Sequence, residues 1–117
     1  RADDLVVKST GINSSLKLYL IQSVDRKLPF EDIAAAKGMD MEKLISEIET
    51  IVFSGTKLNI DYYLEDVFDD DQLEELYDYY IESKSDSIDS AMEEFDGDYE
   101  EEELRLYRIK FLSEIAN

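Results

Sequence analysis

The sequence lacks the residue types on which several common kinds of site depend. Its 117 residues include no cysteine and no histidine. This excludes disulfides, zinc sites of the usual Cys/His kinds, and catalytic arrangements that need an imidazole or a thiol. One proline and four glycines leave little room for linkers, and 44% of the residues are apolar. We therefore expect one mostly helical domain with a modest core.

Long hydrophobic runs are also absent. No segment approaches the roughly 18 apolar residues that mark a membrane span, and the N-terminal RADDLVVKST has neither a signal-peptide core nor an initiator Met. We expect a cytoplasmic piece of a longer protein, without membrane contact. Residues 1–9 are interpreted as a linker and 10–117 as a single helical domain, with a helix-turn-helix part at 10–65 and an acidic helical part at 66–117.

Basic residues are scarce, and the acidic excess is uneven. The chain has 12 basic and 30 acidic residues; residues 1–60 carry 8 and 9 of them, whereas residues 61–117 carry 4 and 21. Such a second half repels phosphate backbones over a Debye length of roughly 8 Å and favours basic partners. Any nucleic-acid contact should come from the first half.

The segment from Leu28 to Gly55 has the pattern of a helix-turn-helix. Pro29 suits the opening of a short helix over Phe30–Lys37, and Gly38 suits its left-handed end. Asp40 can cap a longer helix that ends at Ser54-Gly55. Its apolar residues recur at helical spacing: Met41, Leu44, Ile45, Ile48, Ile51 and Val52. The alternative is an ordinary helical hairpin in which Ala34 permits close contact.

The remaining pattern predicts an all-α fold, a helix-turn-helix core followed by an acidic helical C-terminal half. A short strand pair or an extended link is expected at Thr56–Leu64, which alternates briefly. Asp69 and Gln72 resemble a capping box. In the last helix Glu101 should be the third residue and pair with Arg105. The other predicted helices cover Ser14–Asp25, Asp70–Glu82, Ser87–Phe95 and the residues after Asp98.

Two apolar faces are predicted in the acidic half. On the helix near residues 70–82 the face comprises Leu73, Leu76, Tyr77, Tyr80 and Ile81. On the last helix it comprises Leu104, Tyr107, Phe111 and Ile115. Tyr63 and Tyr79 fit such faces least well, so stacking on single-stranded bases is an alternative to core packing for the tyrosines.

The second helix of the motif is poorly suited to reading DNA by itself. Its early exposed positions are Glu42, Lys43, Ser46 and Glu47, followed by Glu49 and Thr50. Only one of these is basic, and phosphate contacts need Lys or Arg. The candidate nucleic-acid contacts are the lysines that folding could gather beside the motif: Lys17, Lys37, Lys43 and Lys57. The alternative is that they are scattered surface lysines that balance nearby acids.

No residue pattern indicates catalysis or a cofactor. The runs Asp69–Asp71 and Glu100–Glu103 lack the ligand spacing and the glycine of an EF-hand loop, and helix capping explains them more simply. No phosphate-binding loop or dinucleotide fingerprint is present. We expect no catalytic residue, no metal site and no cofactor in this chain.

Three long strings carry a resemblance to a known family: SSLKLYLIQSVDRKLPFEDIAAAKGM, IETIVFSGTKLNIDYYL and EEELRLYRIKFLSEIAN. With them the chain resembles the C-terminal helix-turn-helix segment of bacterial, Bacteroides-like RecQ-type ATP-dependent DNA helicases. The resemblance implies a parent that unwinds DNA in the 3′ to 5′ direction, with ATP, Mg²⁺ and Zn²⁺ bound outside these residues. It transfers no functional residue to this chain.

The sequence therefore supports three functional hypotheses. The first is an accessory domain of such a helicase in DNA replication, recombination and repair, with weak DNA engagement or docking on other domains of the parent. The second is an acidic interaction module that recruits a basic protein or imitates the charge of DNA. The third, a free-standing transcription regulator, would need a basic recognition surface that the sequence does not provide.

Overall fold

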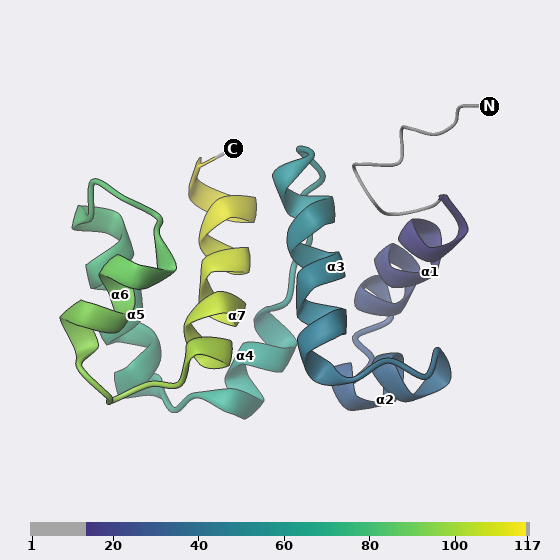
Figure 1. The fold of residues 1–117 in the computed structure, drawn as a ribbon, viewed down its shortest axis with the longest axis horizontal. Helices are drawn as coiled ribbons and strands as arrows, with labels where there is room; N and C mark the ends of the chain where they lie inside the picture. Colours follow the sequence, from purple (N-terminus) through teal and green to yellow (C-terminus); the bar gives the residue numbers. More distant parts are fainter. Residues whose placement is uncertain (1–13, 117) are drawn as a thin grey trace.

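The computed structural model describes residues 14–116, with side chains described for residues 14–114. This part of the chain is all-α and contains no strand. In Figure 1 the helices stand in a row, with α1 and α2 at one end, α3 and α7 in the middle, and α5 and α6 at the other end. The elements are α1 (Ser14–Asp25), α2 (Phe30–Ala36), α3 (Met41–Phe53), α4 (Asp61–Val67), α5 (Asp70–Glu82), α6 (Ile88–Phe95), α7 (Glu101–Phe111) and a terminal π-helical turn η2 (Leu112–Ala116).

Two helices, α3 and α5, start at the predicted capping residues. The Asp40 side chain accepts a hydrogen bond from the Lys43 backbone N–H at 2.8 Å. Asp69 and Gln72 form the predicted capping box, and Ser87 caps α6 one residue before its first helical residue. Short polar side chains thus satisfy backbone donors that have no partner within the helix.

The strand or extended link predicted at Thr56–Leu64 is only half right. Thr56–Ile60 is an irregular link, and α4 begins at Asp61. The Asn59 side chain accepts a hydrogen bond from the Asp61 backbone N–H at 3.0 Å, a turn that leads into the helix. Leu58 and Ile60 are buried as a strand pattern would have them, but residues 14–116 contain no strand with which this segment could pair.

The last helix starts later than predicted. Its N-cap is Glu100, which forms a capping box with Glu103, so Glu101 is the first helical residue and not the third. The left-handed Asp96 and Gly97 (φ 45° and 95°) turn the chain after α6. Tyr99 is then buried, with its hydroxyl donating to Glu75 of α5 at 2.6 Å, and this contact delays the helix.

α7 is the central helix of the fold. It packs against α3, α4, α5 and α6, and for this reason it is buried on more sides than one amphipathic face provides. Leu106 and Ile109 are buried as well as the predicted Leu104 and Tyr107, whereas Phe111 is only partly buried. The predicted Ile115 lies outside the side chains that the structure describes. A single cluster of buried apolar residues draws on both halves of the chain.

The predicted face of α5 needs a larger correction. Leu76 and Tyr80 are buried and Leu73 is partly buried, but Tyr77 and Ile81 are 47% and 46% exposed. Tyr79 takes up the inner position instead, with edge-to-face contacts to Tyr80 and Phe95. The buried face is therefore rotated toward α6.

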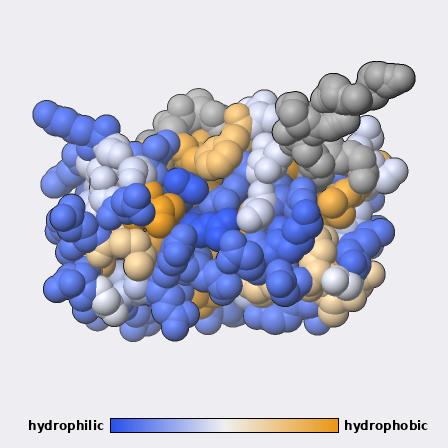
Figure 2. Space-filling model, viewed as in Figure 1, coloured by the Kyte–Doolittle hydropathy of each residue, from blue (hydrophilic) through white to orange (hydrophobic). Residues whose placement is uncertain are grey.

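Hydrophilic side chains dominate the face of the molecule that Figure 2 shows. In Figure 2 they cover most of the face that presents α3, α7 and α6, and the apolar residues there form separate small areas. Among the helices of residues 14–116, none combines the length and the apolar character required to cross a membrane.

Candidate nucleic-acid interface

The turn between α2 and α3 has the geometry that the motif predicts. Gly38 has a φ of +67°, and the backbone N–H of Met39 reaches back to the Ala34 carbonyl at 2.9 Å. This hydrogen bond closes the end of α2 around a left-handed residue. Asp40 then caps α3. The four residues Lys37–Asp40 thus reverse the chain, and α2 packs against α3.

The core beneath the turn contains aromatic residues from distant parts of the chain. Phe30 of α2 stacks on Tyr63 of α4, with ring centroids 4.2 Å apart and planes inclined by 5°. The Tyr63 hydroxyl donates to Glu31 at 2.7 Å. Tyr63 is 7% exposed, so its ring faces have no room for a base, and burial raises its pKa well above the ordinary value. Core packing, and not base stacking, explains Tyr63 and likewise Tyr79.

The outward positions of α3 are largely engaged within the protein. Lys43 pairs with Glu47 one turn later, at 2.7 Å. The Thr50 hydroxyl donates to the Ser46 carbonyl at 3.0 Å. Glu49, which was expected to be exposed, is only 8% exposed. The helix therefore presents few free polar groups to a groove.

Arg105 of α7 binds three side chains of α3. Its Nε and Nη2 donate to the two carboxylate oxygens of Glu49 at 3.1 and 2.7 Å. Nη2 also donates to the Ser46 hydroxyl at 3.0 Å and Nη1 to Glu42 at 3.1 Å. The pairing predicted with Glu101 is replaced by these contacts. Because α3 and α7 run side by side (Figure 1), this guanidinium lies along the seam between them.

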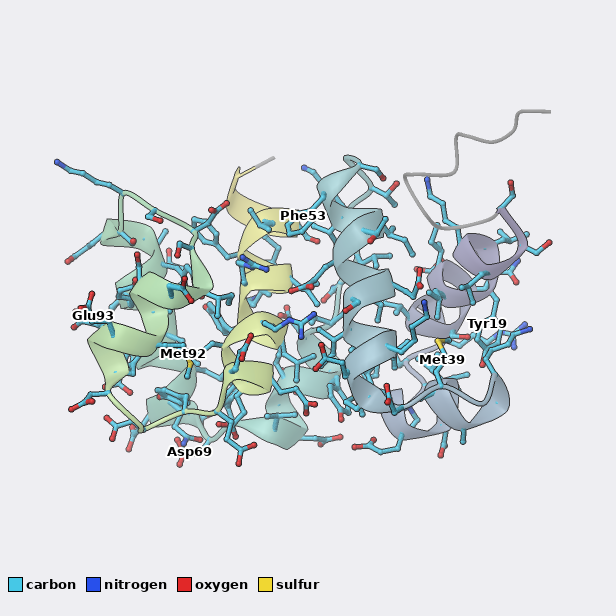
Figure 3. All side chains as sticks on the ribbon, in the orientation of Figure 1. Tyr19, Met39, Phe53, Asp69, Met92 and Glu93 are labelled. Atoms are coloured by element: carbon cyan, nitrogen blue, oxygen red, sulfur yellow. The ribbon has the colours of Figure 1, made fainter. Side chains whose placement is uncertain are left out.

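Arg108, one turn further along α7, completes the network. Its Nη2 donates to Glu49 at 2.9 Å, and its Nη1 donates to the Asp86 carbonyl at 3.2 Å. Its guanidinium also lies 5.4 Å from the centre of the Phe53 ring, which Figure 3 places at the end of α3 that faces α7. We call Glu42, Ser46, Glu49, Arg105 and Arg108 the α3–α7 network.

The electrostatics of the network follow from its burial. Burial alone would raise the pKa of Glu49, but the hydrogen bonds from Arg105 and Arg108 outweigh it and hold that pKa below the ordinary value. The same bonds raise the pKa of Arg105. The charges of Glu49 and Arg105 therefore persist at neutral pH. The Glu49 carboxylate thus holds the guanidinium groups of Arg105 and Arg108 against α3.

The structure does not gather all four candidate lysines. Lys37 and Lys43 flank the α2–α3 turn, and both are exposed. The Lys37 ammonium lies 4.7 Å from the ring centre of Tyr19 of α1, the residue labelled beside Met39 in Figure 3. Lys17 is partly buried on α1. Lys57 follows the opposite end of α3, a helix about 20 Å long, next to Ser113 and Glu114.

The acidic runs serve the helix starts, as expected. Glu100 and Glu103 form the capping box of α7, and Asp69 with Gln72 forms that of α5. Within residues 14–116 no group of three or more acidic side chains is placed to hold a metal ion. These runs therefore offer structure and negative charge.

Sequence reasoning missed the α3–α7 network, although a signal was present. The last helix carries three of the four basic residues of the second half, and two of them, Arg105 and Arg108, are three residues apart. Glu42 and Glu49 are seven apart on the other helix. Both spacings place like charges on one helical face, so the two faces are complementary.

Comparison with known proteins bears on the first half of the chain. No curated protein sequence matches the chain at a significant level. Residues 14–64 match the family model described as RecQ-1-like, helix-turn-helix domain. The match spans α1, α2, α3 and the first turn of α4 and stops before the acidic helices. It supports a RecQ-family helix-turn-helix domain in this part of the chain.

Proposed function

We propose that this chain is a non-catalytic accessory domain of a RecQ-type ATP-dependent DNA helicase. Its helix-turn-helix would serve as a docking scaffold, a structural unit through which the domain docks on other domains of the parent and not a reader of DNA. The family match of residues 14–64 supports the link to such a helicase. The parent would act in DNA replication, recombination and repair, in the bacterial cytoplasm and at the nucleoid. ATP, Mg²⁺ and Zn²⁺ would bind to other parts of it.

The α3–α7 network is the observation that carries the docking role. A major groove about 12 Å wide accepts one helix of about 10–12 Å diameter, but not two that lie side by side. The side of α3 that carries Glu42, Ser46 and Glu49 is held by α7. The main basic residue on the remaining outward side of α3 is Lys43, and it is already paired with Glu47. The motif thus joins the two halves of the domain.

A second candidate function is weak accessory contact with DNA. The exposed Lys37 and Lys43 flank the α2–α3 turn, at the beginning of the helix that other proteins of this motif direct at DNA. Two lysines offer few phosphate contacts, so such binding would be weak and strongly reduced by salt.

A DNA titration separates the two functions. The purified chain would be titrated with single-stranded, duplex and forked DNA at low and at physiological salt. The docking role predicts no measurable binding at physiological salt and little change when Lys17, Lys37, Lys43 and Lys57 are all changed to Glu. Salt-sensitive binding that these changes abolish would contradict it and support the second function.

The link to a helicase has its own test. The natural reading frame upstream of these residues should encode the ATP-binding motifs of a helicase motor. A reading frame without such motifs would contradict the proposed helicase parent. The docking role would then belong to a different parent protein.

A further inference from the structure

α5 presents an apolar stripe to solvent on the side away from α6. Tyr77 and Ile81 are four residues apart and nearly half exposed, and the partly buried Leu73 lies one turn earlier. Residues at this spacing share one side of a helix. The other large exposed apolar residues of the described chain, Leu18 and Phe53, stand singly on other helices. We call Leu73, Tyr77 and Ile81 the α5 stripe.

A pocket of about 300 Å³ adjoins the stripe between α4, α5 and α7. Its apolar walls come from Leu64, Leu73, Tyr77 and Tyr107. This volume is at the small end of the range for ligand pockets and suits one or two large apolar side chains. The stripe and the pocket together offer the anchor points that an amphipathic helix uses when it lies in a groove.

The rim of this surface is acidic. Asp61, Glu65 and Glu74 line the pocket, and the exposed Asp78 directly follows Tyr77 on α5. Lys110, the one basic residue of the lining, is already paired with Asp61 at 2.6 Å and with Glu114 at 3.0 Å. Residues 65–103 contain 19 acidic residues and a single basic one, Lys84. Charge complementarity therefore favours a cationic occupant.

We propose that the α5 stripe and its pocket form a docking site for a cationic amphipathic helix of a protein partner. Apolar residues of that helix would pack against Tyr77 and Ile81, with one of them in the pocket. Its lysines or arginines would lie opposite Glu65, Glu74 and Asp78. Nucleic acids and anionic membranes carry the wrong charge for this surface. The proposal goes beyond the docking scaffold, because it requires neither a helicase parent nor the α3–α7 network.

Three labelled synthetic peptides test the proposal by fluorescence anisotropy with the full 117-residue chain. The first has leucines on one helical face and lysines elsewhere, the second has the same composition in scrambled order, and the third is lysine-rich without leucine. We expect the first peptide to bind about tenfold more tightly than the other two, because only it can place apolar anchors in a row.

Matched substitutions locate the binding surface. Tyr77→Ser combined with Ile81→Ser removes the anchors without changing charge, and it should weaken binding of the amphipathic peptide about tenfold. Leu18→Ser is the control, because it removes an exposed apolar residue from α1; it should leave binding unchanged. Circular dichroism would verify that each variant remains folded.

A second pair of variants tests the acidic rim. Glu74→Gln with Asp78→Asn should weaken the amphipathic peptide about threefold. Asp89→Asn with Glu93→Gln makes the same change in charge on α6, where Figure 3 shows Glu93 on the outer side, and should have a smaller effect. In ¹⁵N NMR spectra the amphipathic peptide should shift the amide signals of Leu73, Tyr77 and Ile81.

Three results would overturn the proposal. They are equal binding of all three peptides, unchanged binding after Tyr77→Ser with Ile81→Ser, and no binding of the amphipathic peptide. None of them bears on DNA binding or on the upstream reading frame, so failure here is distinct from failure of the proposed function.

Discussion

Glu49 of α3 and Arg105 of α7 form a two-pronged ion pair, with both carboxylate oxygens bound at 3.1 and 2.7 Å. The two residues are 56 positions apart and come from opposite halves of the chain. Their side chains are only 10% and 11% exposed. Planar bidentate pairs are the most directional of charged contacts. This pair therefore fixes how the acidic half lies against the helix-turn-helix.

Removal of the Glu49 carboxylate should destabilise the protein strongly. Glu49→Ala would leave Arg105 and Arg108 without their shared partner in a mostly buried site, which we expect to lower the free energy of unfolding by about 3 kcal/mol. Chemical denaturation measures this. Glu47→Ala, which removes a pair with the exposed Lys43, is the control and should change stability by less than about 1 kcal/mol. Equal effects of the two changes would contradict a structural role for the network.

The contribution of Glu49 should disappear in acid. Because its pKa in the folded protein lies below the ordinary value of 4.5, the folded state favours the charged form. The resulting stability is fully present above pH 4.5 and is lost as the pH falls through the folded-state pKa. The difference in unfolding free energy between the wild type and Glu49→Gln should thus stay constant from neutral pH to about pH 5.5 and narrow below about pH 4.5. Glu93→Gln on α6 is the control, and a Glu49 difference independent of pH would refute this explanation.

Local signals predicted the elements well because each acts within a few residues. A capping side chain such as Asp40 or Asp69 bonds to a backbone group only three residues away. Gly38 ends α2 because its own backbone adopts the left-handed conformation that glycine favours. Such contacts depend little on the remainder of the fold, and for that reason α1, α3 and α5 have the predicted limits.

The errors arise where contacts between distant segments prevail. Tyr99 is held by Glu75, 24 residues away, and this shifts the start of α7. Tyr79 turns inward because α6 supplies Phe95, which leaves Tyr77 outside. The pairing of Arg105 with Glu49, and not with Glu101, depends on the placement of α7 against α3. A periodic pattern finds an apolar face, but it does not say how many neighbours a helix has.

The turn of the motif should depend on Gly38. With a φ of +67° and no atom within 4 Å of an added Cβ, a side chain there would meet backbone strain and no clash. Gly38→Ala should therefore lower the free energy of unfolding by about 1 kcal/mol. Gly38→Asn should lower it less, because asparagine tolerates the left-handed region better. An equal loss for both variants in thermal or chemical denaturation would argue against this explanation.

Two buried tyrosines should respond in opposite ways to loss of their hydroxyl groups. Tyr80 is 1% exposed and packs on Tyr107, and its hydroxyl has no hydrogen-bond partner among the described residues. Tyr80→Phe removes a buried hydroxyl that makes no hydrogen bond within the described residues. The free energy of unfolding should therefore stay level or rise by up to about 1 kcal/mol. Tyr63→Phe breaks the bond to Glu31 and should lower stability by about 1 kcal/mol. If Tyr80→Phe proved the more damaging change in denaturant unfolding, the Tyr80 hydroxyl would have a partner in solution.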